Sequence, residues 1–172
     1  HFQAALETKP EKAIKLEKDA LAQIENITAD NARLVSNLHA NLGGLYRMNG
    51  HPDLAREHME KSISLLDQFN LLHINDSIPQ IANYAMFLTE QQEPERGISE
   101  LQKLSGIIKE YHSDDCLDYA KVQETLGTIY LMTANLPQAK THFKRAFKIY
   151  EKIWADEPEM IEAKYQEIQE LY

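Results

Sequence analysis

The sequence has little glycine and no long apolar run, and both absences narrow the class of protein. Only six of its 172 residues are glycine and six are proline, whereas an average chain of this length has about twice as many glycines. No segment approaches the roughly 18 consecutive apolar residues that a membrane-spanning helix needs. Alanine, leucine, glutamate, lysine and glutamine are abundant instead, and these residues favour helix over strand.

The chain also lacks an excess of basic charge and has almost no cysteine. Its formal net charge is −9, which repels the phosphates of nucleic acids and the headgroups of anionic lipids. We therefore expect neither nucleic acid nor a membrane surface as a direct partner. The single cysteine, Cys116, excludes an internal disulfide and suits a reducing compartment. The expected location is the cytoplasm.

Motifs that carry enzyme chemistry are missing from the sequence as well. It contains no phosphate-binding glycine loop, no HExxH pair and no nucleophile elbow. One cluster, His112 with Asp114, Asp115 and Cys116, contains residue types that bind metals. Since this cluster precedes an expected helix, we interpret Asp114 and Asp115 as helix caps and dipole partners. The sequence thus predicts no catalytic residue, no metal and no cofactor.

What the sequence does contain is a repeat of 42 residues. Small residues recur at this interval in one series, Gly43, Ala85 and Gly127. A second small-residue series and a proline series have the same period: Ala13, Ala55, Gly97 and Ala139; Pro10, Pro52 and Pro94, with Pro137 one residue late. Three series in register indicate an internal repeat, and its length suits two helices per unit.

Each series has a physical interpretation in a pair of antiparallel helices. Small residues let two helices approach closely where they cross. Proline is tolerated in the first turn of a helix, so each proline marks the start of a second helix. The apolar spacing predicts helices over 10–27, 31–49, 52–69, 77–91, 94–111, 116–134, 137–153 and 158–172, with the end of another helix at 1–7.

The two ends of the chain fall inside a repeat. His1 and Gln169 lie one period outside Gly43 and Gly127, so the chain opens and closes within a first helix. We therefore expect a single repeat domain over residues 1–172 that is an excerpt of a longer protein. Truncated end units would expose apolar edges, which makes end-to-end self-association possible.

The repeat resembles a known family through its first-helix segment and the small and aromatic residues that follow. The segment Leu126-Gly127-Thr128-Ile129-Tyr130, followed by Ala139, Phe143 and Ala146, is similar to the tetratricopeptide repeat. The step of 42 resembles the longer variety found in kinesin light chains and in bacterial peptide-sensing regulators. The resemblance implies an all-α fold, a right-handed superhelical solenoid of antiparallel helix pairs with about four repeats.

In such a solenoid the first helices line a concave groove. Asn41, Asn83 and Thr125 stand 42 residues apart on the expected first helices. An asparagine side chain both donates and accepts hydrogen bonds, so this ladder could hold the backbone of an extended peptide. The resemblance to kinesin light chains implies that role for Asn41 and Asn83. The alternative is that each asparagine bonds a neighbouring helix.

Other first-helix residues share the expected groove. The predicted peptide-binding residues are Asn37, Asn41, Gly44, Arg47, Asn83, Met86, Lys121, Thr125 and Thr128. Arg47 and Lys121 could bind a carboxylate, and nearby methionines could supply adaptable apolar contacts. For Arg47, Lys121 and the methionines taken singly, a solvated charge or an ordinary packed methionine is the alternative.

The sequence therefore predicts a non-catalytic scaffold that binds a protein or peptide partner in the concave groove. An alternative is a peptide-sensing regulatory module, in which the bound peptide controls an effector domain outside this segment.

Overall fold

The computed structural model describes residues 9–73 and 77–170, which form helices and connecting turns without any strand. The helices of this part of the chain are α1 (Lys9–Ala22), α2 (Ala32–Met48), α3 (Pro52–Gln68), α4 (Ser77–Glu90), α5 (Pro94–Tyr111), α6 (Leu117–Met132), α7 (Leu136–Ile153) and α8 (Pro158–Gln169). The predicted all-α fold is confirmed. The helix bounds differ from the predicted ones by a few residues, except that α1 ends at Ala22 rather than at residue 27. The helix predicted at 1–7 lies outside the described residues.

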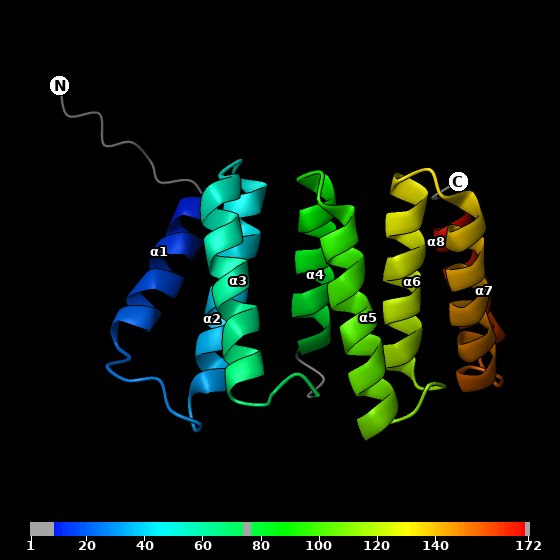
Figure 1. Cartoon of the computed structure of the whole chain (residues 1–172), viewed down its shortest axis with the longest axis horizontal. Coiled ribbons are helices and arrows are strands. Elements are labelled where there is room, and N and C mark those ends of the chain that lie inside the picture. The colour runs from blue at the N-terminus through cyan, green and yellow to red at the C-terminus, as the bar shows by residue number, and fades with distance from the viewer. Residues whose placement is uncertain (1–8, 74–76, 171–172) are drawn as a thin grey trace. The chain divides into compact units, whose positions relative to one another are not determined.

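The chain divides into two compact units. The N-terminal unit, His1–Leu71, contains α1 to α3, and the C-terminal unit, Leu72–Tyr172, contains α4 to α8. In the N-terminal unit α2 packs on α3 and α1 packs on α2. In the C-terminal unit α4 pairs with α5 and α6 with α7, while α6 also contacts α4 and α5, and α8 contacts α7 (Figure 1).

Small residues of the two series face each other in two helix pairs, α2 with α3 and α4 with α5. A Cβ atom built on Gly97 of α5 would lie 2.6 Å from the carbonyl oxygen of Ala85 in α4. A Cβ on Gly43 would lie 2.5 Å from Cγ of Met59. Such distances are far below van der Waals contact, so the helices approach as closely as they do because these positions carry almost no side chain. The predicted role of the small residues is confirmed.

The turn inside each pair has the same backbone conformation in three repeats. Gly50, Gln92 and Ala134 lie 42 residues apart and have positive φ angles of 73°, 64° and 58°. The amide that follows each of them bonds back to the preceding helix, as in the bond of 2.9 Å from His51 N to Tyr46 O. This is the Schellman ending of a helix. A proline then stands in the first turn of each second helix, as predicted.

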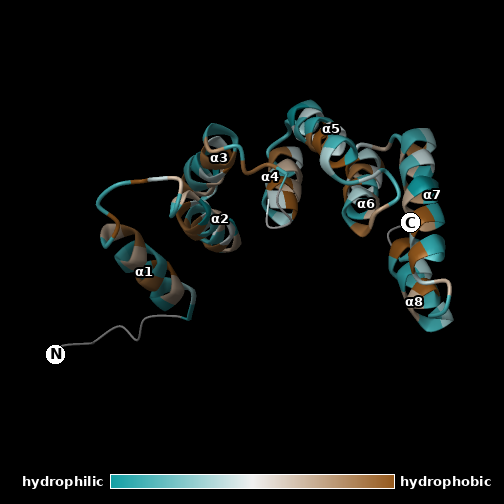
Figure 2. Cartoon of the chain, turned by 90° about the horizontal axis from the view of Figure 1, so that it is seen from below, coloured by the Kyte–Doolittle hydropathy of each residue, from teal (hydrophilic) through white to brown (hydrophobic). Residues whose placement is uncertain are grey.

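The apolar faces of the helices form the core of each unit. Each helix in Figure 2 carries both hydrophobic and hydrophilic residues, as expected of amphipathic helices. The largest fully buried side chains are Tyr119, Tyr150, Phe87, Leu42, Leu65, Leu66, Leu88, Leu101, Leu104, Ile108, Leu126 and Ile129. Within the described residues, no helix is both apolar enough and long enough to cross a lipid bilayer.

The predicted cap of α6 was wrong. The side chain of Cys116, rather than that of Asp114 or Asp115, accepts from the backbone N–H of Tyr119 at 3.5 Å. Asp115 instead bonds Lys152, and Asp114 lies 3.7 Å from Arg145. These two carboxylates therefore connect the loop before α6 to the neighbouring helix α7.

Two helix pairs contain a polar contact at the same repeat position. In the N-terminal unit Nδ1 of His39 lies 2.9 Å from Nδ1 of His58. In the C-terminal unit Nδ1 of His142 lies 2.9 Å from Oε1 of Gln123. Each histidine of the second helix also stacks on a tyrosine of the first helix, as His58 does on Tyr46 with ring centroids 5.4 Å apart.

Burial keeps these histidines neutral. It is the main cause that lowers the pKa of His39 to about 4, and the charges of His58 and Lys61 lower it further against the opposing effect of Glu57. Burial also lowers the pKa of His58 and of His142. A hydrogen bond between two imidazoles needs one donor and one acceptor, so at least the accepting ring of the His39 pair must be uncharged for the contact to form.

We predict that Gly97→Ala destabilises the C-terminal unit by about 1–3 kcal/mol, because the added methyl group meets backbone that cannot move aside. Gly106 of the same helix is the matched control, since a Cβ there meets no atom within 4 Å. Gly106→Ala should raise stability by about 0.5–1 kcal/mol, as usual for an exposed helical glycine. Urea unfolding followed by circular dichroism measures both, and equal effects would contradict the close approach.

We predict that the chain loses stability as the pH falls from 6.5 towards 4. His39 has a lowered pKa of about 4 in the folded state against 6.5 ordinarily, so the unfolded chain binds a proton more readily in this window. Stability is complete above the window and decreases through it. His39→Gln reproduces the pair of Gln123 with His142 and removes one titrating group, so its melting temperature should fall less over the same range. An identical fall in both proteins would rule the pair out as a cause.

Candidate peptide-binding surface

Two pockets lie on either side of α6 in the C-terminal unit. The larger, of about 590 Å³, opens between the first helices α4 and α6. Its lining residues are Ile78, Pro79, Ala82, Cys116, Leu117, Asp118, Lys121 and Thr125. The smaller, of about 290 Å³, lies among α6, α7 and α8. Its lining residues are Leu117, Lys121, Glu124, Thr125, Tyr150, Trp154 and Lys164.

One row of side chains forms a wall of both pockets. Leu117, Lys121 and Thr125 line each of them, and their spacing of four residues places them along one side of α6. Lys121 is exposed and Thr125 is half-buried. The structure thus brings together two of the predicted groove residues and adds Leu117 beside them. We call these three residues the α6 ridge.

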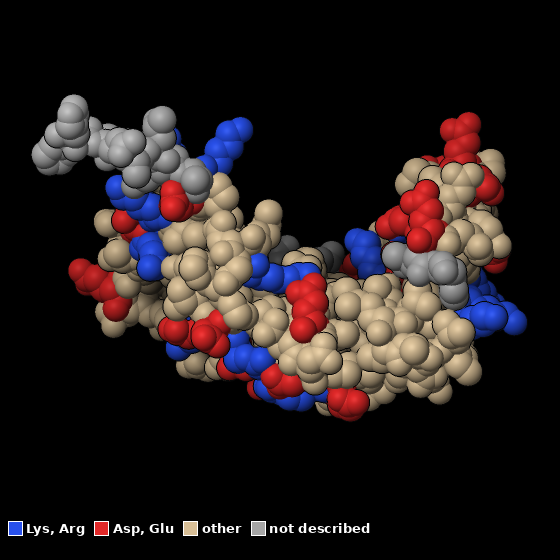
Figure 3. Space-filling model, turned by 90° about the horizontal axis from the view of Figure 1, so that it is seen from above, with Lys and Arg blue, Asp and Glu red and all other residues tan. Residues whose placement is uncertain are grey.

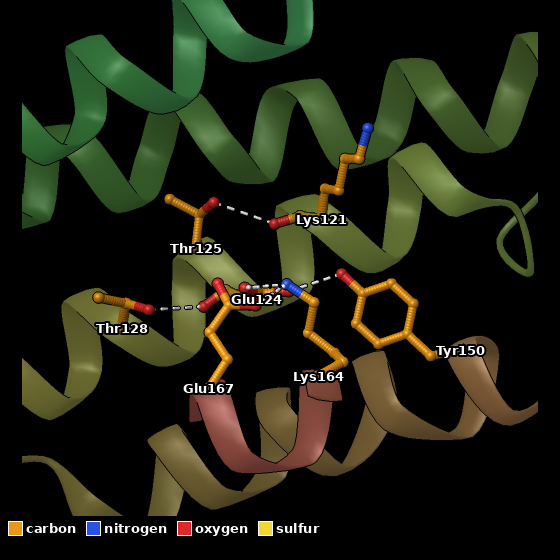
Figure 4. Close-up of polar contacts among 7 residues, drawn as sticks. All are labelled: Lys121, Glu124, Thr125, Thr128, Tyr150, Lys164 and Glu167. Carbon is orange, nitrogen blue, oxygen red and sulfur yellow. Dashed lines mark hydrogen bonds and ion pairs between the residues drawn. The ribbon is translucent and has the colours of Figure 1, made fainter. Parts of the chain in front are cut away.

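The threonine hydroxyls of α6 bond their own helix. Oγ1 of Thr125 donates to the carbonyl oxygen of Lys121 at 3.0 Å, and Oγ1 of Thr128 donates to that of Glu124 at 3.1 Å (Figure 4). Each hydroxyl proton is therefore in use, while the oxygen can still accept a hydrogen bond. Thr125 consequently offers less hydrogen bonding than an asparagine at the same repeat position.

A polar network that the sequence did not predict closes one side of the smaller pocket. The hydroxyl of Tyr150 donates to Oε2 of Glu124 at 2.6 Å, and Nζ of Lys164 lies 3.3 Å from Oε1 of Glu124 and 2.6 Å from Oε2 of Glu167 (Figure 4). These contacts join α6 to α7 and α8. A signal was present in the repeat, because Ala40 and Ala82 occupy the position that Glu124 takes.

The network shifts the pKa of two of its members. Burial is the main cause that raises the pKa of Tyr150, and its bond to Glu124 raises it further. Burial alone would lower the pKa of Lys164, but Glu167 and Glu124 outweigh that effect and raise it. Both groups therefore keep their protons at neutral pH. Glu124 and Glu167 carry one negative charge more than Lys164 balances, and Lys121 is the other basic residue that lines this pocket.

Trp154 contributes to the same pocket. Its ring stacks on Tyr150 with centroids 4.8 Å apart and planes 6° from parallel. The stack gives Trp154 a packing role at the end of α7. The half-buried ring also lines the smaller pocket, so the indole gives that pocket an aromatic wall.

The predicted residues of α2 lie in the N-terminal unit. Asn41 is exposed, while Asn37, Gly44 and Arg47 are half-buried. Nδ2 of Asn41 donates to Oε1 of Glu17 in α1 at 3.0 Å. Asn41 therefore bonds a neighbouring helix, which is the structural alternative to peptide binding at this position. Glu17 takes the place of Met59, Leu101 and Phe143 in the repeat, and this bond accounts for a carboxylate there.

The predicted residues of α4 belong to a helix that lines the larger pocket. Asn83 is exposed and Met86 is half-buried, while the adjacent residue Ala82 lines the pocket. Asn83 and Thr125 belong to the C-terminal unit and Asn41 to the N-terminal unit. A continuous ladder through all three residues stays a prediction.

Charge is unevenly spread around the smaller pocket. Acidic side chains gather over α8 in Figure 3, where Glu159, Glu162 and Glu167 are exposed. A carboxylate approaching from that side would be repelled. Lys121 of the α6 ridge, which borders both pockets, is an exposed cation.

Comparison with known proteins agrees with the repeat and the helix pairs. Residues 77–152 match the tetratricopeptide repeat family. A search of solved structures finds the crystal structure of BtubC (BKLC) from P. vanneervenii, with a TM-score of 0.72 and 20% sequence identity over 83% of this chain. The match covers 56% of that protein, so the chain spans little more than half its length. No curated protein sequence matches.

The family match falls on α4 to α7, which contain the larger pocket and the α6 ridge. The structural match extends the same fold over most of the chain. Residues 77–152 are therefore similar to tetratricopeptide repeats, and the chain has an all-α, solenoid-type fold.

Proposed function

We propose that the chain is a scaffold that binds an extended segment of a partner protein across the α6 ridge. Tetratricopeptide repeats generally bind proteins, and the first-helix face of this C-terminal unit has a shape that suits a peptide. The observation that carries the proposal is that one row of residues borders two pockets. A segment that crosses the ridge can place a side chain in each pocket.

The chemistry of the ridge indicates the kind of segment. Lys121 is exposed between the pockets and offers three hydrogen-bond donors to a carboxylate. The larger pocket has apolar walls from Ile78, Pro79 and Leu117, and the smaller has the ring of Trp154. A partner segment with an acidic group close to apolar side chains matches this arrangement, since each contact then meets its complement.

The other predicted residues extend the same proposal. Exposed Asn83 can bond the backbone of a segment that lies along α4. Asn41 can do so in the N-terminal unit only by exchanging its bond to Glu17. We propose that both units form one repeat domain. We also propose that this domain catalyses no reaction, as the residues of the ridge are a lysine, a leucine and a threonine.

The test uses peptides selected from a phage-displayed random library on the immobilised chain. We predict that Lys121→Ala weakens their binding by about tenfold or more, because a hydrogen bond to a charged group contributes about 1.5–3 kcal/mol. Fluorescence anisotropy with labelled peptides gives the Kd values. Circular dichroism verifies that the variant retains its helices.

Lys140→Ala is the matched control, since Lys140 is an exposed lysine on the second helix α7. It should leave the Kd unchanged. If the selected peptides bind the Lys121→Ala protein as tightly as the original, or lose affinity equally with Lys140→Ala, the α6 ridge is not the binding surface.

A further inference from the structure

The contact between His39 and His58 in the N-terminal unit joins two nitrogen atoms at a separation that suits a hydrogen bond and also suits two ligands of one metal ion. The two Nδ1 atoms lie 2.9 Å apart and come from different helices, α2 and α3. Two nitrogen ligands of one zinc ion, each at ~2.0–2.1 Å, lie roughly 2.9–3.4 Å from each other. The separation of the imidazole nitrogens falls at the short end of this range.

Both rings are in the chemical form that binds metals. Neutral imidazole is the ligand, and burial disfavours the charged form of each ring. At present one ring donates its Nδ1 proton to the other. If that proton moves to Nε2 of the same ring, both Nδ1 lone pairs become available without the release of a proton. A modest rotation of the rings then directs the two lone pairs at a common point.

The surroundings leave room for an ion and its water. A pocket of about 530 Å³ is lined by His39, Glu57, His58, Glu60, Lys61 and Ser64. Its lining includes two carboxylates and one ammonium group, and the charge of Glu57 opposes the effect of the nearby lysines on both histidines. Glu60 lies 3.8 Å from Arg56, and the charge of Lys18 acts on His58 from α1. Within the described residues no three His, Cys, Asp or Glu side chains form a ready metal site, so water must complete the coordination.

We propose that His39 and His58 bind one divalent transition-metal ion of the class that prefers imidazole, such as Zn²⁺ or Cu²⁺. The two Nδ1 atoms are the protein ligands, and water in the adjoining pocket supplies the others. Mg²⁺ and Ca²⁺ prefer oxygen ligands and do not bind between two imidazoles. An ion at this place joins α2 to α3 and so stabilises the helix pair.

The C-terminal unit shows what distinguishes the site. At the same repeat position Gln123 replaces His39, and its Oε1 accepts from His142. The amide of Gln123 also donates to Ser105 of α5 at 3.4 Å. That pair keeps the hydrogen bond without a second imidazole. The pair of Gln123 and His142 is therefore an internal comparison for the pair of His39 and His58. It joins two helices in the same way but has only one imidazole.

The test is titration of the whole chain with ZnCl₂ by isothermal calorimetry at neutral pH, alongside long-range ¹H–¹⁵N spectra of the histidine rings. We expect one Zn²⁺ to bind and to shift the Nδ1 resonances of His39 and His58. In His39→Gln the affinity should fall by more than about tenfold, since changes to groups that only orient a ligand already cost that much. Zn²⁺ should also raise the Tm of the original chain and not that of the variant.

His51→Gln is the matched control, because His51 is an exposed histidine of the same unit. It should bind Zn²⁺ as the original does. Titration with MgCl₂ should produce no binding at this site. Equal Zn²⁺ affinity in the original and in His39→Gln, unshifted Nδ1 resonances of His39 and His58, or equally tight Mg²⁺ binding would each overturn the proposal.

Discussion

The close approach of paired helices is the constraint on which the structure depends. In the C-terminal unit the backbone of α5 meets the backbone of α4 at Gly97 and Ala85, where no side chain separates them. This contact fixes how the two helices cross. It also determines which residues of α4 turn towards the core and which stay exposed. The position of Asn83, exposed beside buried Tyr84 and Ala85, therefore follows indirectly from a missing side chain on the next helix.

Most of the fold followed from the period of the sequence. The small residues and prolines marked the crossing points and the starts of the second helices, and the structure places them there. The end of α1 at Ala22 did not follow, because Ile24 and Ile27 continue the apolar spacing beyond the last helical turn. The positive φ angles of Gln92 and Ala134 could not be predicted either, since neither residue is of a type that favours a positive φ.

The candidate site was predictable only in part. The repeat register placed Lys121 and Thr125 on one face of α6, and they do line common pockets. It could not reveal that Asn41 has a competing contact, because the bond from Asn41 to Glu17 joins two different repeats. The network around Glu124 depends on Lys164 from α8, and pairing a carboxylate with a lysine two helices away needs three-dimensional information.

Departures from the repeat coincide with the polar features of the chain. Glu17 stands where other repeats have large apolar residues, Glu124 stands where they have alanine, and His39 stands where the next repeat has Ile81. Each departure brings a polar partner: Asn41, Tyr150 and His58 respectively. A polar group without a hydrogen-bond partner between packed helices costs free energy. A polar residue is therefore tolerated at such a position where a second polar residue bonds it.

The shared wall of the two pockets has a consequence for how tightly a segment can be held. Once a side chain fills the larger pocket, Leu117, Lys121 and Thr125 have lost much of their rotational freedom. A second side chain entering the smaller pocket meets the same three residues already immobilised. The entropy lost on ordering the ridge is then incurred once for two contacts. Occupation of one pocket therefore favours occupation of the other.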